Sequence, residues 1–64
     1  MKFKTGDKVV VNRAGENFQG EIVSIETVFE KKDDIGLRRV AVEFDGWTKV
    51  FLKHESDFDF IEAV

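Results

Sequence analysis

Cysteine is absent from the sequence, and histidine occurs once, as His54. These absences exclude disulfide bridges, thiolate zinc sites, cysteine nucleophiles and metal centres that need several histidines. No uncharged stretch approaches the ~20 residues that span a bilayer, and the charged start Met1-Lys2-Phe3-Lys4 leads into no apolar signal segment. We therefore expect a soluble, cytoplasmic protein that needs no cofactor and contacts no membrane.

Good helix formers are also scarce, because the chain has two leucines, three alanines and one methionine. In their place stand nine valines, four isoleucines, three threonines, seven phenylalanines and one tryptophan. β-branched and aromatic side chains suit a pleated sheet, and no long window repeats apolar residues at helical spacing. The 64 residues leave room for one domain, 1–64, with a thin core. The composition therefore predicts a single all-β domain.

Turn signals divide the chain into five short strands. The adjacent Ile22 and Val23 interrupt the alternation of the second strand, which predicts a bulge or a strong bend. Asp45-Gly46 predicts a tight hairpin between the third and fourth strands. The predicted strands cover about 7–12, 20–29, 37–45, 47–53 and 58–62, with one 3-10 turn at 54–57. Short strands with one bend predict a closed, strongly bent five-stranded barrel, since closure removes unpaired edges.

Two parts of the chain resemble a known family of small barrels. Gly6-Asp7-Lys8-Val9-Val10-Val11, followed by Gly15 and Gly20-Glu21-Ile22, resembles the KOW-type start of Src-homology-3-like (SH3-like) barrels. Val42-Glu43-Phe44-Asp45-Gly46 and Glu55-Ser56-Asp57-Phe58-Asp59-Phe60-Ile61 resemble the closing half of such barrels. The resemblance implies an SH3-like barrel and a binding role, since the superfamily includes KOW modules, Tudor-like readers and short phage-encoded accessory proteins.

The net charge of −3 does not favour a nonspecific nucleic-acid binder, whose affinity depends on a basic field. KOW modules that hold RNA usually carry lysines in the first loop, where this chain has Glu16-Asn17-Phe18-Gln19. Lys31, Lys32, Arg38 and Arg39 nevertheless predict a small basic patch that would contact phosphate or an acidic partner. The alternative is that these charges belong to solvated faces and keep strands from pairing with other chains.

Alternation in the third and fourth strands predicts which side chains face the core. In the third strand, Val40, Val42 and Phe44 are predicted to point inward. In the fourth strand, one face carries two aromatic rings and a lysine, and the other carries Val50 and Leu52. Because of the lysine, we expect the aromatic face, formed by Trp47, Lys49 and Phe51, to point outward.

Phe18, from the first loop, would then join this outward face. Phe18, Trp47, Lys49 and Phe51 together predict a shallow aromatic groove that binds a peptide or a stacked base. The alternative is that so small a barrel uses Phe18 and Trp47 in its core.

No pattern in the chain indicates catalysis. His54 beside Glu55 fits a turn, no serine stands in a nucleophile elbow, and no glycine-rich loop precedes a helix. Asp33-Asp34 supplies too few oxygens for calcium. Three hypotheses remain: a non-catalytic module that docks on a protein partner, a nucleic-acid-associated module, and a structural subunit of a larger assembly. We favour the first.

Overall fold

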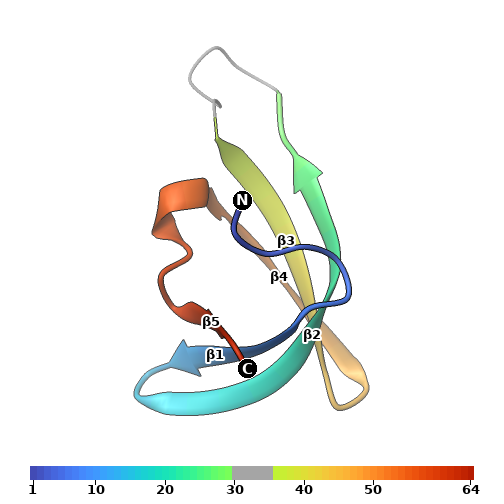
Figure 1. The fold of residues 1–64 in the computed structure, drawn as a ribbon, viewed down its shortest axis with the longest axis vertical. Helices are drawn as coiled ribbons and strands as arrows, with labels where there is room; N and C mark the ends of the chain where they lie inside the picture. The colour runs from blue at the N-terminus through green and yellow to red at the C-terminus, as the bar shows by residue number, and fades with distance from the viewer. Residues whose placement is uncertain (30–35) are drawn as a thin grey trace.

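The computed structural model describes residues 1–29 and 36–64. In this part of the chain, five strands form one antiparallel sheet in the order β4-β3-β2-β1-β5, with a 3-10 turn before the last strand (Figure 1). The elements are β1 (Lys8–Arg13), β2 (Glu16–Thr27), β3 (Leu37–Phe44), β4 (Trp47–His54), the 3-10 turn (Glu55–Asp57) and β5 (Ile61–Ala63). The predicted all-β class, the five strands and the 3-10 turn are confirmed. Among the described residues, no helix has the length and apolar character needed to cross a bilayer.

The β1–β2 and β3–β4 hairpins each turn within two residues that have positive φ. These residues are Ala14 (53°) and Gly15 (81°) between β1 and β2, and Asp45 (47°) and Gly46 (95°) between β3 and β4. Two central residues at positive φ characterise type I′ turns, whose twist matches that of the strands they join. The predicted Asp45-Gly46 hairpin is therefore confirmed.

The first hairpin and the last strand differ from their predicted bounds. Strand β2 begins at Glu16 rather than near Gly20, and Phe18 lies opposite Val11 of β1. The two-residue turn allows pairing to start at once, and the polar side chains that suggested a loop are exposed there. At the other end, the Ile61 amide donates to the Phe58 carbonyl (3.2 Å) and closes a turn over residues 58–61 after the 3-10 turn, so β5 starts only at Ile61.

The bend predicted at Ile22-Val23 is present as a register shift between Ile22 and Ser24 in the ladder with β3. At this point the N-terminal segment forms two hydrogen bonds with the backbone of Ile22. The Ile22 amide donates to the Asp7 carbonyl (2.9 Å), and the Ile22 carbonyl accepts from the Gly6 amide (2.7 Å). One long strand therefore pairs with β1 through its first half and with β3 through its second half.

The core lies on the concave side of the bent sheet. It follows the predicted phasing of β3, because Val40 and Val42 are fully buried and Phe44 is 5% exposed. Phe3, from the segment before β1, is also buried, which the alternation of the strands could not indicate. The largest fully buried side chains are Phe58, Ile22, Ile61, Val9, Val11, Val40 and Val42.

The faces of β4 are the reverse of those expected. Phe51 is 7% exposed and lies opposite the buried Val40, so the face predicted to point outward is turned toward the core. Val50 and Leu52, on the other face, are 52% and 53% exposed. The prediction of an outward Phe51 is therefore wrong, because pairing with β3 places odd-numbered residues of β4 on the core side whatever their polarity.

The sheet bends strongly but does not close into the predicted barrel. Its two edges are β4 and β5, and in the described part of the chain β4 pairs with β3 alone and β5 with β1 alone (Figure 1). The three residues of β5 leave little backbone for a further ladder. Instead, the rings of Phe51 and Phe60 pack across the opening with centroids 5.2 Å apart. Side chains close this side of the core, while the outer edge of β4 has no partner strand in residues 1–29 and 36–64.

Candidate functional site

The four residues predicted to bind a partner line one groove of about 310 Å³, which we call the aromatic groove. The structure therefore brings Phe18, Trp47, Lys49 and Phe51 together, although Phe51 points inward. The full lining is Arg13, Ala14, Glu16, Phe18, Phe44, Trp47, Lys49 and Phe51.

Three aromatic rings form the end of the aromatic groove next to the β3–β4 turn. Phe44 is buried, and its ring contacts Trp47 at 5.0 Å between centroids and Phe18 edge-on at 6.4 Å. Trp47 is 54% exposed and Phe18 is 40% exposed. Both rings thus lie against the core and still present apolar surface to solvent. Each ring therefore contributes to the core and to the groove, the two positions that sequence analysis treated as alternatives.

Local strand geometry explains why these rings meet. Trp47 follows the Asp45-Gly46 turn and lies directly opposite Phe44. Phe18 is carried by the β1–β2 hairpin, two residues before Gly20, where the strands approach closely. A Cβ atom on Gly20 would lie 2.7 Å from the Glu43 carbonyl oxygen and 2.9 Å from the Phe44 ring. The absence of a side chain at residue 20 lets β2 pack against β3 and keeps the ring of Phe44 in place.

A second hollow, of about 260 Å³, continues from the aromatic groove toward the opening between β4 and β5. The two hollows share Arg13, Lys49 and Phe51. The guanidinium of Arg13 lies 5.8 Å from the Phe51 ring centroid, and the ammonium of Lys53 lies 5.8 Å from that of Phe60. Aromatic rings and cations therefore alternate along this surface, and two of the cations lie within cation–π distance of a ring.

We call Arg13, Lys49 and Lys53 the basic rim. Sequence analysis identified Lys49 but not Arg13 or Lys53. The usable signal was the β4 alternation Trp47-Thr48-Lys49-Val50-Phe51-Leu52-Lys53, in which every second residue is aromatic or basic. Arg13 gave no such signal, since its position depends on how the β1–β2 hairpin folds over the sheet.

The predicted basic patch does not assemble as one surface in the described residues. Arg38 and Arg39 are consecutive in β3, so their side chains leave opposite faces of the sheet. Arg38 donates to the Leu37 carbonyl (3.2 Å) and lies 3.8 Å from Glu55, while Arg39 lies 3.3 Å from Glu26. Carboxylates thus compensate both charges. Lys31 and Lys32, like Asp33-Asp34, lie outside the described residues.

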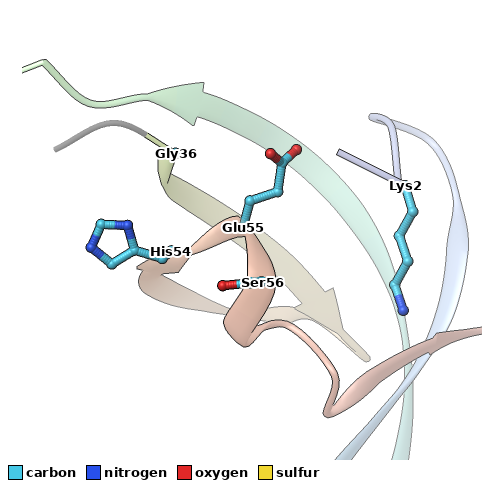
Figure 2. A pocket seen from close by; sticks show the side chains of 5 residues that line it. All are labelled: Lys2, Gly36, His54, Glu55 and Ser56. Atoms are coloured by element: carbon cyan, nitrogen blue, oxygen red, sulfur yellow. The ribbon is translucent and has the colours of Figure 1, made fainter.

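The only histidine of the chain lines an open hollow of about 540 Å³ with Lys2, Gly36, Glu55 and Ser56. Figure 2 shows the imidazole of His54 and the side chain of Lys2 extending away from the Glu55 carboxylate on different sides. No hydrogen bond between side chains joins His54, Ser56 and Glu55 within the described ranges, so they do not form a relay that would activate a nucleophile.

Glu55 instead holds the N-terminal segment and β3 against the 3-10 turn. Its carboxylate forms an ion pair with the α-amino group of Met1 and a longer one with Arg38, and its amide donates to the Gly36 carbonyl (2.8 Å). The hydrogen bond from the α-amino group lowers the pKa of Glu55, although partial burial opposes the shift. This cluster therefore serves structure.

Another exposed ion pair links β1 to β2. The ammonium of Lys8 donates to Glu21 Oε1 at 2.5 Å, and these two residues lie opposite each other in the ladder. The hydrogen bond and the charge of Glu21 raise the pKa of Lys8. Within residues 1–29 and 36–64, no group of three or more histidine, aspartate or glutamate side chains could hold a metal ion.

Neither a protein-family model, nor a curated protein, nor a solved structure matches this chain. The aromatic groove therefore has to be interpreted from its own geometry and chemistry.

Proposed function

We propose that the protein is a non-catalytic binding module that docks on a protein partner through the aromatic groove. The observation that carries this proposal is the half-exposed ring of Trp47, which is supported from below by the buried Phe44 and flanked by Phe18. Tryptophan rings held by packing and open to solvent are frequent anchors of protein interfaces, because they bury a large area and lose little side-chain entropy on binding.

The composition of the groove favours binding over chemistry. Rings and aliphatic stems form its lining, and the charged groups at its margin are the guanidinium of Arg13, the ammonium of Lys49 and the carboxylate of Glu16. Such a surface can seat an apolar side chain and orient it with a few polar contacts. A volume of about 310 Å³ fits one or two side chains of a partner segment.

The proposal is tested by selecting peptides from a displayed random library on immobilised protein and measuring their affinities for two variants. Trp47→Ala removes the anchor, whereas Val23→Ala truncates an exposed side chain of β2 that does not line the aromatic groove. We expect Trp47→Ala to weaken binding by roughly thirtyfold, the effect of losing a hot-spot residue. We expect Val23→Ala to leave the affinity unchanged.

Both variants should keep the far-ultraviolet circular dichroism of the wild type, because neither side chain is buried. Selected peptides that bind wild type and Trp47→Ala equally would contradict docking in the groove. Tight, salt-sensitive binding of oligonucleotides, with a steep loss of affinity as salt rises, would instead support the nucleic-acid hypothesis.

A further inference from the structure

The outer edge of β4 carries backbone groups that have no strand partner among the described residues. Phe44 and Trp47 flank a two-residue turn and so form a hydrogen-bonded pair. Because such pairs alternate along an antiparallel ladder, the odd-numbered residues from Trp47 to Lys53 bond to β3. The even-numbered residues from Thr48 to His54 therefore direct their amides and carbonyls away from the sheet. An edge of this kind can accept an added strand.

The side chains along this edge alternate in chemistry as well as in direction. The odd-numbered residues face the aromatic groove and its continuation, and they read aromatic, cation, aromatic, cation: Trp47, Lys49, Phe51, Lys53. The even-numbered Val50 and Leu52 leave apolar side chains half-exposed on the other face. A strand added here would therefore meet rings and ammonium groups in turn on one face and aliphatic groups on the other.

In the described part of the chain, the cations of the basic rim are not held in ion pairs, although Glu16 lies opposite Arg13 in the β1–β2 ladder. Arg13, Lys49 and Lys53 form no ion pair with a described residue, unlike Arg38 and Arg39. Glu16 lines the aromatic groove but not the adjoining hollow that contains Lys53. An otherwise acidic protein thus keeps a cationic strip along the edge of β4, which is complementary to carboxylates.

We propose that an acidic, extended segment of a partner protein adds to the outer edge of β4 as a sixth strand. Its apolar side chains lie against Trp47 and Phe51, and its carboxylates lie opposite Lys49 and Lys53, since residues directly across a ladder interact. The amides and carbonyls of the segment pair with those of the even-numbered residues of β4. This inference rests on the proposed docking function and adds to it the chemistry and backbone conformation of the partner.

The first test uses a synthetic peptide in which threonine alternates with glutamate and phenylalanine in turn, so that every second residue is acidic or aromatic. Threonine favours the extended conformation and packs against Val50 and Leu52. We expect this peptide to bind, and to slow hydrogen exchange at the amides of Val50 and Leu52 by tenfold or more. The amide of Phe51, already bonded to β3, should keep its rate. A control peptide of the same composition, with glutamates and phenylalanines placed side by side, should bind weakly.

The second test reverses charge on both sides of the ladder. Lys49→Glu should weaken binding of the acidic peptide by about fivefold or more, because it removes an attractive pair and adds a repulsive one. A peptide with lysine in place of each glutamate should recover affinity for Lys49→Glu and bind the wild type poorly. Lys4→Glu, an exposed change in the N-terminal segment, is the matched control and should have no effect.

Each failure has a distinct meaning. Binding that quenches Trp47 fluorescence without protecting Val50 and Leu52 would overturn strand addition and leave groove docking intact. Failure of the acidic peptide to bind, while peptides selected from the library bind through Trp47, would overturn the acidic partner alone. Displacement of the peptide by oligothymidylate would assign the basic rim to nucleic acid. A dimer in sedimentation, with the edge amides protected before any peptide is added, would show that a second copy of the chain occupies β4.

Discussion

Phe51→Ala should mainly reduce folding stability, whereas Trp47→Ala should mainly reduce binding, although both rings lie on the same face of the same strand. Phe51 is 7% exposed and packs against Phe60, so Phe51→Ala removes a buried ring and leaves a cavity. Such truncations cost about 3–5 kcal/mol. A domain of this size has a total stability of roughly 3–10 kcal/mol, so this variant should be largely unfolded or close to it.

Trp47 is 54% exposed, and its main described ring contact is with Phe44 at 5.0 Å. Losing that contact should cost about 1 kcal/mol of folding stability, while peptide binding weakens by roughly thirtyfold. Urea denaturation monitored by far-ultraviolet circular dichroism measures both variants on one signal, and Phe51→Leu keeps a folded reference if Phe51→Ala does not fold. A cost below about 1 kcal/mol for Phe51→Ala, or above about 3 kcal/mol for Trp47→Ala, would refute the assignment of the two rings.

Three further outcomes test the packing that supports the groove. Gly20→Ala should lose about 1–3 kcal/mol in chemical denaturation, because the new methyl group meets the Glu43 carbonyl oxygen at 2.7 Å; an unchanged midpoint would contradict this close approach. Val42→Ala should cost about 2 kcal/mol or more as a buried truncation, and a neutral result would reject the phasing of β3. The pKa of Glu55 is lower in the folded protein than its ordinary value of 4.5, so its ion pairs stabilise the fold above pH 4.5 and this stabilisation is lost as the pH falls through the folded-state pKa. Glu55→Gln should therefore reduce the loss of folding stability at acid pH. An unchanged acid dependence would show that the ion pairs contribute nothing.

Features set by neighbouring residues could be predicted from the sequence. β-branched and aromatic side chains indicated strands, Asp45-Gly46 indicated a tight turn, and the adjacent Ile22 and Val23 indicated the bend. Each of these depends on backbone preferences or on alternation within a few residues, which act before any tertiary contact forms. The grouping of the aromatic rings of β4 with Phe18 was also predicted, because the rings of β4 share one face by alternation alone.

The tertiary structure decided which face of β4 is buried. Both faces mix apolar and polar residues, Trp47-Lys49-Phe51 on one and Val50-Leu52 on the other, so alternation could not rank them. Pairing with β3 decides which face is buried, because it places Phe51 opposite the buried Val40. Lys49 lies on the core-facing side of β4 but still reaches solvent, because β4 is an edge strand and the core opens into the aromatic groove there.

The tertiary structure also decided whether the sheet closes into a barrel and which basic side chains are compensated by carboxylates. The short β5 and the ring contact between Phe51 and Phe60 leave the outer edge of β4 without a strand partner among the described residues, and no local sequence pattern predicts how far apart two strands will lie. Arg38 looked available in the sequence, yet it lies near Glu55, seventeen positions away in the numbering. Composition and alternation act along the chain and determined the strands, whereas distances between strands determined which rings and cations remain exposed at one edge.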